Sequence, residues 1–501
     1  MAISNPGGLL NSVPAPFRQT LATNYLDLNG AAGWGQQYVP DLMEKEAEVF
    51  GPRTISGFLS QVGAEEAMTA DQVIWSEQGR LHLSYKASVA AAGGVVIGAA
   101  GGASSRITLN TDIDGRPLNA AGHSIRVNDT IIVSDANNGV VKCLVGAVAA
   151  TTIDVSPYNN GAVALVAQAT AGATTVLVYG SEFGKADSYR SSTGTEVGTR
   201  GANEPDFQTF SNKPIIMKDY YEVSGSDVSK IGWVETTSEE GATGYMWYLK
   251  AESDTRARFN DYIEMAMLEA EKSDATSDLD GSAWLNGSAA ATDVGSEGLF
   301  AAIESRGNIT SGITGISAAI DLAEFDAILT EFDSQGAIEE NMLFVNRATS
   351  LAMDDMLASM NSYGAGGTSY GVFDNSEDMA LNLGFSGFRR GSYDFYKSDM
   401  RYLNDKATRG GINATAGANA IRGIMVPAGT STVYDQMLGK NLKRPFLHVR
   451  YRASQTDDRK MKSWVTGSVG AATSALDAMQ LHFLTERCLV TQGANNFMLL
   501  K

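Results

Sequence analysis

The sequence has few of the features that mark secreted, metal-binding or membrane-spanning proteins. Only two cysteines occur among 501 residues, Cys143 and Cys488, which excludes a disulfide framework and a CxxC metal site. No run approaches the ~18 consecutive apolar residues of a membrane-spanning helix. The first residues lack the basic and apolar regions of a signal peptide. We therefore expect a soluble protein that is cytosolic when made.

Basic residues are also scarce, with 38 Lys and Arg against 57 Asp and Glu and a net charge of −19. This balance argues against a protein that grips nucleic acid over its whole surface, because phosphate neutralisation needs clustered basic side chains. Proline is rare, at 11 residues, whereas glycine is abundant, at 53, which indicates many turns and ordered loops. The length predicts two or more domains.

No convincing catalytic motif is present. Residues 367–371 (GTSYG) match the G-x-S-x-G of a hydrolase nucleophile elbow, with His448 and His482 later in the chain. The elbow needs a strand before it and a helix after it, and both flanks here have loop composition. We interpret the segment as a glycine-rich loop, and a serine hydrolase using Ser369 stays as the least favoured alternative.

Metal and cofactor sites are likewise missing from the sequence pattern. Residues 110–115 (NTDIDG) imitate the start of an EF-hand loop, but the twelfth position is Ala121, where a Glu is required. A β-turn is favoured there, with a weak Ca²⁺ site as the alternative. The four histidines show no ligand spacing. The sequence predicts no catalytic residue, no metal, no cofactor and no enzyme activity.

What the chain does have is one long helical pattern over residues 242–272. Its middle is polar, because Glu252, Thr255 and Arg256 fall on the apolar stripe. A helix of ~31 residues spans ~45 Å, and since the apolar heptads do not continue through this middle, a strut is favoured over a coiled coil. The stripe at helical spacing consists of Tyr245, Tyr248, Leu249, Phe259, Tyr262, Ile263, Ala266, Met267 and Ala270.

The segments before this helix are predicted to form an arm, a hairpin and an insertion. Residues 1–60 predict an extended arm with a short helix at 42–50. The extended runs 72–86 and 207–223 are expected to pair as the two limbs of one projecting hairpin. Between them, residues 93–180 have almost no aromatics and predict a small antiparallel β-barrel or sandwich, followed by a loop at 184–205. Its expected strands are 107–109, 125–127, 130–134, 140–148, 152–155, 162–166 and 174–178.

The segments after the helix predict a polar loop over 273–298 and then an α/β or α+β unit. The expected helices are 322–332 and 348–360, and the segment from 476 is expected to be short and amphipathic, before a final strand. The expected strands are 342–345, 385–396, 423–426, 433–435 and 446–451.

Residues 440–462 form the densest basic run. Leu447, Val449 and Tyr451 alternate with His448, Arg450 and Arg452, as in a strand with one charged face. Such a face meets acidic residues of the same or a neighbouring subunit, and we favour this interface over a nucleic-acid surface.

The order of these parts resembles the major capsid protein of tailed bacteriophages, whose fold, the Hong Kong 97-type or Johnson fold, is shared with encapsulins. The stretches that carry the resemblance are the hairpin at 74–85, the helix ending in MAMLEAEK, the loop reaching Glu297-Gly298-Leu299, and LGFSGFRRGSYDFYKSDMRYLND at 383–405. The whole chain most resembles capsid proteins of crAss-like phages. It departs from the minimal pattern by the 93–180 insertion and by lacking a long charged coiled-coil segment, which implies a separate scaffolding protein.

The resemblance implies an α+β fold with seven parts. These are an N-terminal arm at 1–60, an E-loop with limbs at 61–92 and 181–225, and an inserted all-β domain at 93–180. The others are a P domain at 226–310 with its spine helix at 242–272, an apical A domain at 311–475, and a return to the P domain at 476–501.

The implied function is that of a shell subunit that self-assembles into hexamers and pentamers of an icosahedral head enclosing double-stranded DNA. Expected partners are further copies of the chain and portal, scaffolding and accessory proteins, with no membrane and no sequence-specific DNA binding. The alternative is an encapsulin-like compartment shell. The expected location is the virion, after synthesis in the bacterial host cytoplasm. Candidate intersubunit contacts are Arg80, Lys86, Glu239, Glu240, Glu252, Arg256, Arg258, Arg389, Arg390, Lys443, Arg444, Arg450 and Arg452.

Overall fold

A computed structural model describes most of the chain after residue 56. The described residues are 57–59, 64–78, 84–89, 95–97, 102–113, 115, 117–118, 122–159, 165–185, 207–230, 235–237, 243–273, 294–336, 338–360, 387–428, 430–435, 440–469 and 472–501. The short helix expected at 42–50, nearly all of the arm at 1–60 and the loop at 367–371 lie outside them.

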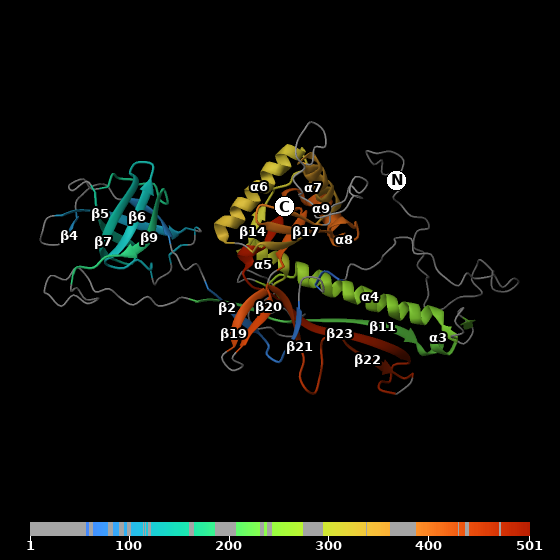
Figure 1. Cartoon of the computed structure of the whole chain (residues 1–501). Helices are drawn as coiled ribbons and strands as arrows, with labels where there is room; N and C mark the ends of the chain where they lie inside the picture. The colour runs from blue at the N-terminus through green and yellow to red at the C-terminus, as the bar shows by residue number, and fades with distance from the viewer. Residues whose placement is uncertain are drawn as a thin grey trace. The chain divides into compact units, whose positions relative to one another are not determined.

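The described residues form two compact units (Figure 1). The main unit holds the described residues up to Trp75 and from Phe210 onward, and the barrel unit holds those of Ser76–Thr209. The chain therefore leaves the main unit once and returns to it.

A five-stranded sheet in the main unit brings together strands that are far apart in the sequence. Its members are β1 (Ala64–Met68), β11 (Ile215–Ser224), β21 (Leu447–Arg452), β22 (Lys462–Gly467) and β23 (Ala478–Thr491). The long strand β23 pairs antiparallel with β11, β21 and β22, and β1 runs parallel to β21. The expected short amphipathic segment from 476 is thus wrong. β23 is central and mostly buried, so its sequence lacks the alternation that marks a half-exposed strand.

Helix α4 (Met246–Glu269) packs on one face of this sheet. Phe259 and Ile263 contact Leu481 and Phe483 of β23, and the rings of Phe259 and Phe483 lie 6.0 Å apart. Because side chains alternate along a strand, this contact leaves the face that carries residues 480, 482 and 484 opposite the helix.

Two expectations for this helix are wrong. Residues 243–245 belong to strand β13 (Thr243–Tyr245), which pairs with β12 (Glu235–Thr237), so the helix begins only at Met246. Tyr262 is 46% exposed. The buried line runs through Phe259, Ile263 and Met267, and Tyr262 lies about 100° round the helix from Ile263, outside the contact with the sheet.

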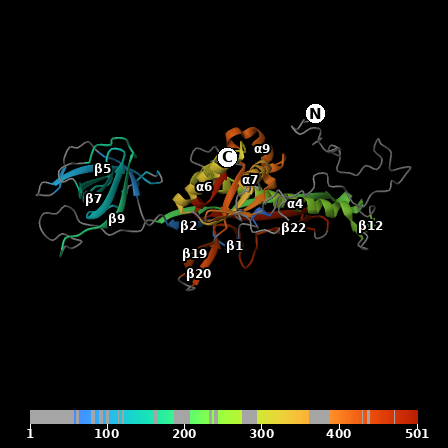
Figure 2. The ribbon, with the colours of Figure 1, turned by 45° about the horizontal axis from the view of Figure 1, so that its top comes forward.

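The second sheet of the main unit has six strands in the order β14-β24-β18-β15-β17-β16. Helices α6 (Ala318–Gln335) and α7 (Arg347–Met360) contact it through a core that includes Phe325, Met353 and Phe395 (Figure 2). The strands are β14 (Asn308–Thr310), β15 (Glu340–Val345), β16 (Gly387–Arg390), β17 (Tyr393–Asp399), β18 (Gly423–Pro427) and β24 (Met498–Leu500).

The region expected as one strand at 385–396 is a hairpin. β16 and β17 pair antiparallel, and Gly391 between them has φ +63°. Glycine adopts this left-handed conformation without steric cost, so it permits the tight turn.

The remaining pieces of the main unit are short. Helix α5 (Leu299–Arg306) begins directly after Gly298, whose amide donates to the carbonyl of Ala270 at 2.7 Å. A Cβ at Gly298 would approach Ala270 N to 2.8 Å, so only glycine fits this close approach. The others are α3 (Gly225–Lys230), α8 (Arg401–Asn404), α9 (Arg409–Ala416), η5 (Gly417–Asn419), η6 (Ala494–Asn496), β19 (Thr430–Asp435) and β20 (Lys440–Pro445).

The expected pairing of the two extended runs is confirmed for part of their length. β2 (Val73–Gln78) and β10 (Phe207–Asn212) form a two-stranded sheet. Arg306 of α5 lies over the Phe210 ring at 4.6 Å and over Trp75 at 5.8 Å from the ring centroids. The rest of each run goes elsewhere, since β3 (Ser84–Val89) pairs within the barrel unit and β11 pairs with β23.

The barrel unit is a closed ring of six antiparallel strands in the order β3-β9-β6-β7-β8-β5, because β5 also pairs with β3. β4 pairs with β5 outside the ring. Its interior is apolar and includes Ile107, Ile131, Val145 and Val176, each fully buried. The other strands are β4 (Val95–Ile97), β5 (Gly102–Asp112), β6 (Asp129–Asp135), β7 (Gly139–Val148), β8 (Thr152–Pro157) and β9 (Thr174–Ser181).

One of the strands expected in this region is not formed, and the described end of another is irregular. Residues 125–127 are irregular although Ile125 is buried, and 165–166 are irregular while 162–164 lie outside the described residues. Both segments supply single side chains, Ile125 and Leu165, to the core without joining the ladder.

Candidate functional site

The basic run at 440–462 meets carboxylates of its own chain. Arg450 of β21 pairs with Glu66 of the neighbouring strand β1 at 2.8 Å. Arg452 pairs with Asp71 and lies 3.6 Å from Glu486 Oε1. The parallel register of β1 and β21 places Glu66 directly opposite Arg450, which explains why these charges meet.

The centre of this ion-pair network is the buried guanidinium of Arg487 on β23. It donates to Glu65 Oε1 at 3.0 Å, to the carbonyl of Lys460 at 2.8 Å and to Thr485 Oγ1 at 2.8 Å. Burial lowers the pKa of Arg487 from its usual range, and the carboxylates of Glu65 and Glu264 oppose that shift. A buried charge needs such partners to be tolerated.

Further pairs extend the network to the loop before β22. Arg459 pairs with Glu486 at 2.8 Å, Lys460 with Glu65, and Lys462 with Asp457 at 2.6 Å. The expected single charged face is only partly right, because His448 is buried and its Nδ1 lies 3.2 Å from the Pro445 carbonyl oxygen. These pairs hold β1, β21 and β23 together, and they engage the described basic side chains of the run, which are Arg450, Arg452, Arg459, Lys460 and Lys462.

Several other predicted contact residues also have partners in the same chain. Arg258 pairs with Asp219 at 3.2 Å, and Arg389 with Asp394 at 3.6 Å. Arg390 makes a bidentate pair with Asp326, with Nη2 at 2.6 Å from Oδ2. Whether any of these residues also contacts a second subunit stays a prediction.

The other predicted contact residues fall into three groups. Lys86 lies on β3 in the barrel unit and donates to Thr175 Oγ1 at 3.1 Å. On α4, Glu252 is half-buried and Arg256 is exposed. Outside the described residues, or with side chains outside them, lie Arg80, Glu239, Glu240, Lys443 and Arg444.

A buried carboxylate that the sequence analysis missed lies on α4. Glu264 accepts the backbone N–H of Gly57 at 3.0 Å and that of Leu59 at 3.4 Å, and so it fixes the start of the described chain against the helix. Burial raises the pKa of Glu264, while these two amides and Arg487 act against the rise. A buried carboxylate could have been predicted here, because Glu264 follows Ile263 on the buried side of the helix. Its partners could not, because only the fold brings Gly57 and Leu59 to it.

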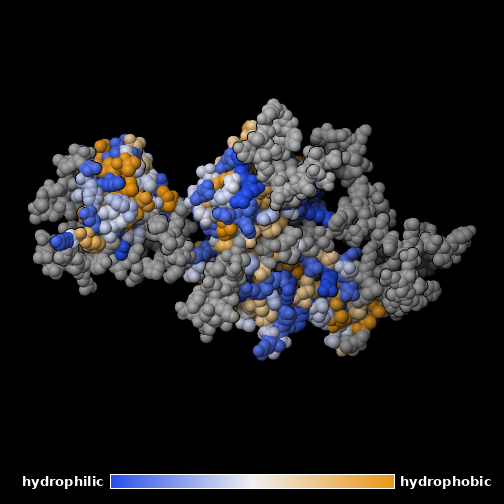
Figure 3. All heavy atoms as spheres, viewed as in Figure 1, coloured by the Kyte–Doolittle hydropathy of each residue, from blue (hydrophilic) through white to orange (hydrophobic). Residues whose placement is uncertain are grey.

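Three aromatic rings line up across β11, β23 and β22. His482 stacks on Trp464 with ring centroids 5.1 Å apart and on Tyr220 at 5.9 Å. Strand alternation places this stack on the sheet face opposite α4, where Tyr220 is 56% and Ile216 53% exposed. Figure 3 shows hydrophobic residues gathered near the ends of β22 and α3.

The structure gives no support to a catalytic reading of the later histidines. His448 is buried against a carbonyl oxygen and His482 lies between two rings, with Nε2 2.7 Å from Thr466 Oγ1. Burial raises the pKa of Cys143 and Cys488 to about 12, so neither thiol ionises near neutral pH.

The described part of the chain holds no cluster of three or more His, Cys, Asp or Glu side chains suited to a metal ion. At the EF-hand-like segment, the amide of Gly115 donates to the carbonyl of Asp112 at 3.2 Å, which is a turn contact. None of the described helices combines the length and hydropathy that a membrane crossing requires.

No family model matches the sequence, and no curated protein is similar to it. The solved structures that the chain is similar to include chains from phages and from phage capsids. A chain from Microbacterium phage Oxtober96 is 10% identical over 94% of this chain and 98% of its own length, with a TM-score of 0.38. A chain of the mature capsid of bacteriophage PhiM1 is 10% identical over 60% and 75%, with a TM-score of 0.30. Likeness at this level does not by itself define the fold or the function of the chain.

Proposed function

We propose that this chain is a structural shell subunit of a tailed-phage head, which self-assembles into hexamers and pentamers and encloses double-stranded DNA. The observation that carries the proposal is the long β11–β23 ribbon, covered by α4 on one face and partly exposed on the other, which we call the open face. On the open face Tyr220 lies beside the Trp464–His482 stack, and Ile216, opposite Glu486, is 53% exposed. Exposed apolar side chains that gather on one face are typical of a surface that another subunit covers.

The β2–β10 sheet gives a second argument. An isolated two-stranded sheet is only marginally stable in water. Trp75 and Phe210 at one end pack on Arg306, whereas Ile74 is 64% exposed. A hairpin of this kind gains stability when it lies on a neighbouring subunit, as the E-loop of the capsid family does.

In this proposal the parts of the chain take the family's names. α4 is the spine helix of the P domain at 226–310, and β2 and β10 lie in the E-loop limbs at 61–92 and 181–225. Helices α6 and α7 lie in the A domain at 311–475, residues 476–501 return to the P domain, and residues 1–60 form the N-terminal arm. The insertion at 93–180 makes up most of the barrel, and the phage is a crAss-like member of the Caudoviricetes.

In this proposal the shell encloses the DNA without binding it. The net charge of −19 keeps DNA from adhering to the wall, and the described basic side chains of the run, from Arg450 to Lys462, pair with the chain's own carboxylates. Further partners of the proposal are portal, scaffolding and accessory proteins. The mature location is the virion, after synthesis in the host cytoplasm.

Among the predicted contact residues, Arg256 and Arg389 are the best placed to meet a second subunit. Both are exposed, and the side chain of Arg389 keeps 64% exposure despite its contact with Asp394. Obligate shell interfaces bury on the order of 2,000 Å² or more. Single charges of this kind therefore fix how two subunits align and contribute little to the affinity between them.

The proposal is tested by particle formation in a variant of the open face. Ile216→Arg places a charge on that face, and we expect it to reduce the yield of hexamers, pentamers and shells by about tenfold or more, at ~1.4 kcal/mol per tenfold. Val140→Arg is the matched control, because Val140 is 70% exposed on the barrel unit. Assembly of Ile216→Arg at the wild-type yield would contradict the role of the open face.

An encapsulin-like compartment is the second candidate, because it shares the fold of the capsid family and because the described basic side chains of the 440–462 run pair with carboxylates of the chain. The two are separated by the contents of native particles. Packaged double-stranded DNA supports the phage head, whereas a protein cargo without DNA supports the compartment.

A further inference from the structure

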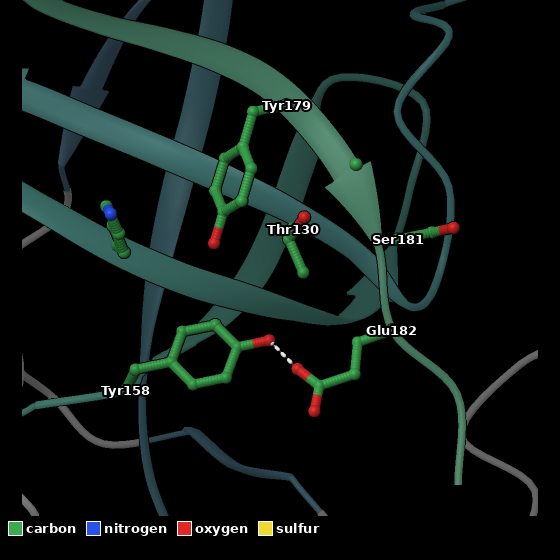
Figure 4. A pocket seen from close by; sticks show the side chains of 7 residues that line it. Thr130, Tyr158, Tyr179, Ser181 and Glu182 are labelled. Atoms are coloured by element: carbon green, nitrogen blue, oxygen red, sulfur yellow. Dashed lines mark hydrogen bonds between the residues drawn. The ribbon is translucent and has the colours of Figure 1, made fainter.

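The outer wall of the barrel unit carries a hollow of about 430 Å³. This size lies within the ~300–1,000 Å³ that is typical of small-molecule sites. The side chains that line it come from three neighbouring strands, β9, β6 and β7, and from the residues that directly follow β8 and β9 (Figure 4). They are Thr130, Lys142, Tyr158, Tyr179, Ser181 and Glu182.

The sheet register explains why a closed barrel has a hollow at this place. The β6–β9 ladder shifts between Thr130 and Ile131, so Tyr179 has no direct partner across the ladder. Such a bulge changes the direction of side chains on the strand. Gly180 lies opposite Thr130, and a Cβ there would approach Thr130 Oγ1 to 3.2 Å. The absence of a side chain at Gly180 keeps this part of the hollow open.

Two half-exposed tyrosines face the hollow. Tyr158 is 46% and Tyr179 49% exposed, and Figure 4 shows both rings beside Thr130, with Glu182 next to the Tyr158 hydroxyl. The amide of Tyr158 donates to the Lys142 carbonyl at 3.0 Å, so the two residues are neighbours. The barrel core does not need these rings, since its interior is filled by other side chains.

A charged side chain lies beside each of the two tyrosine rings. The Tyr158 hydroxyl donates to Glu182 Oε2, which fixes the ring. Burial raises the pKa of Tyr158, and Glu182 raises it further, so the hydroxyl stays a donor at neutral pH. Lys142 Nζ lies 6.0 Å from the centre of the Tyr179 ring. The hollow therefore offers two tyrosine rings with their hydroxyls, one carboxylate, one ammonium and the hydroxyls of Thr130 and Ser181.

This set of groups selects among ligand classes. Glu182 repels an anion such as a phosphate, and one carboxylate is too few ligands for a divalent cation. A wholly apolar ligand would bury the Lys142 ammonium and the charge of Glu182 and offer neither of them a hydrogen bond, which is costly. A sugar ring presents apolar C–H faces that pack on tyrosine and hydroxyls that bond to carboxylate and ammonium groups. We propose that this hollow is a binding site for a short, neutral saccharide.

The proposal is tested by calorimetric titration of the purified full-length chain with chitotriose, cellotriose and mannotriose. We expect at least one of them to bind with a Kd of about 1 mM or tighter. Tyr179→Ala removes one aromatic face, and we expect it to weaken binding by about tenfold, or ~1.4 kcal/mol. Val166→Ala is the matched control, because Val166 is 54% exposed on the same unit and does not line the hollow.

A second variant keeps the test decisive if Tyr179→Ala disturbs folding. Glu182→Gln keeps the size of the side chain and removes the charge that accepts sugar hydroxyls, and we expect it to weaken binding by about threefold to tenfold. Hydrogen exchange of the barrel amides checks that each variant is folded. The proposal is overturned if none of the three trisaccharides binds, or if folded Tyr179→Ala and Glu182→Gln both bind as the wild type does.

Discussion

The barrel and the α4-covered sheet differ in how their strand edges and faces are covered. In the barrel, six strands close on themselves, so the ring has no free strand edge, and its core is complete within one segment of the chain. The five-stranded sheet is assembled from strands as distant as β1 and β23, and only one of its faces is covered by α4. On its other face, aromatic rings stack in the open.

The difference indicates where each part obtains its stability. Closure and an apolar interior complete the core of the barrel within one segment of the chain, and the proposed saccharide site lies on its outer wall. The sheet depends on charge pairs between distant segments and, in the proposed shell, on neighbouring subunits. The predictions below test this contrast.

The largest effect is expected in the barrel core. Ile131 is fully buried, so Ile131→Ala should lower the free energy of unfolding of the barrel by ~2–5 kcal/mol and leave the main unit unchanged. Val140→Ala, at a residue 70% exposed on the same unit, should change it by less than ~0.5 kcal/mol. Hydrogen exchange resolved by unit measures both. Equal destabilisation of the two units by Ile131→Ala would show that the barrel is not self-sufficient.

A smaller effect is expected from the charge network. Glu65→Ala leaves the buried Arg487 without its carboxylate, and because Glu65 is itself 33% exposed, we expect a loss of about 1–3 kcal/mol in the main unit. Glu271→Ala, at an exposed residue just after α4, is the control. Denaturant unfolding measures the change, and a loss no greater than that of the control would mean that the network does not hold β1.

The pH dependence of the main unit should carry the signature of Glu264. Since the pKa of this carboxyl is raised in the folded state, the folded chain binds its proton more tightly than the unfolded chain does. Its contribution to stability is therefore largest at low pH and is lost as pH rises from about 4.5 through the folded pKa. In Glu264→Gln this loss should disappear. Parallel stability curves for the wild type and Glu264→Gln above that pH would contradict the assignment.

The smallest effect on folding is expected on the open face. Tyr220 is 56% exposed, so Tyr220→Ala should change the free energy of unfolding by less than ~0.5 kcal/mol. The same change should reduce assembly, because the ring belongs to the proposed contact surface. Thermal unfolding together with sedimentation separates the two. A variant that unfolds much earlier than the wild type would place Tyr220 in the fold itself rather than at an interface.

The helices and strands that were predicted correctly are those whose residue pattern lies within one short segment of the sequence. The strands at 130–134, 140–148, 152–155 and 174–178 and the helices at 322–332 and 348–360 all lie within observed elements of the same type. Turn residues and period-2 or period-3.6 patterns report on neighbouring residues, which is why these elements were found.

The sequence could not show which distant strands pair. β3 looks like one limb of a hairpin, yet it closes the barrel by pairing with both β5 and β9. The candidate site shows the same limit. Arg450 and Arg452 were recognised as charged positions, but their partners Glu66 and Asp71 are more than 380 residues away, and only the β1–β21 register brings them together.

The central claim is that the open face of the sheet and the β2–β10 hairpin are covered by other copies of the chain. Negative-stain microscopy of the concentrated, purified protein tests this most directly. The account predicts rings of six and five subunits or closed icosahedral shells. A uniform monomer at every concentration, with residues 73–78 and 207–212 already protected from hydrogen exchange, would contradict it.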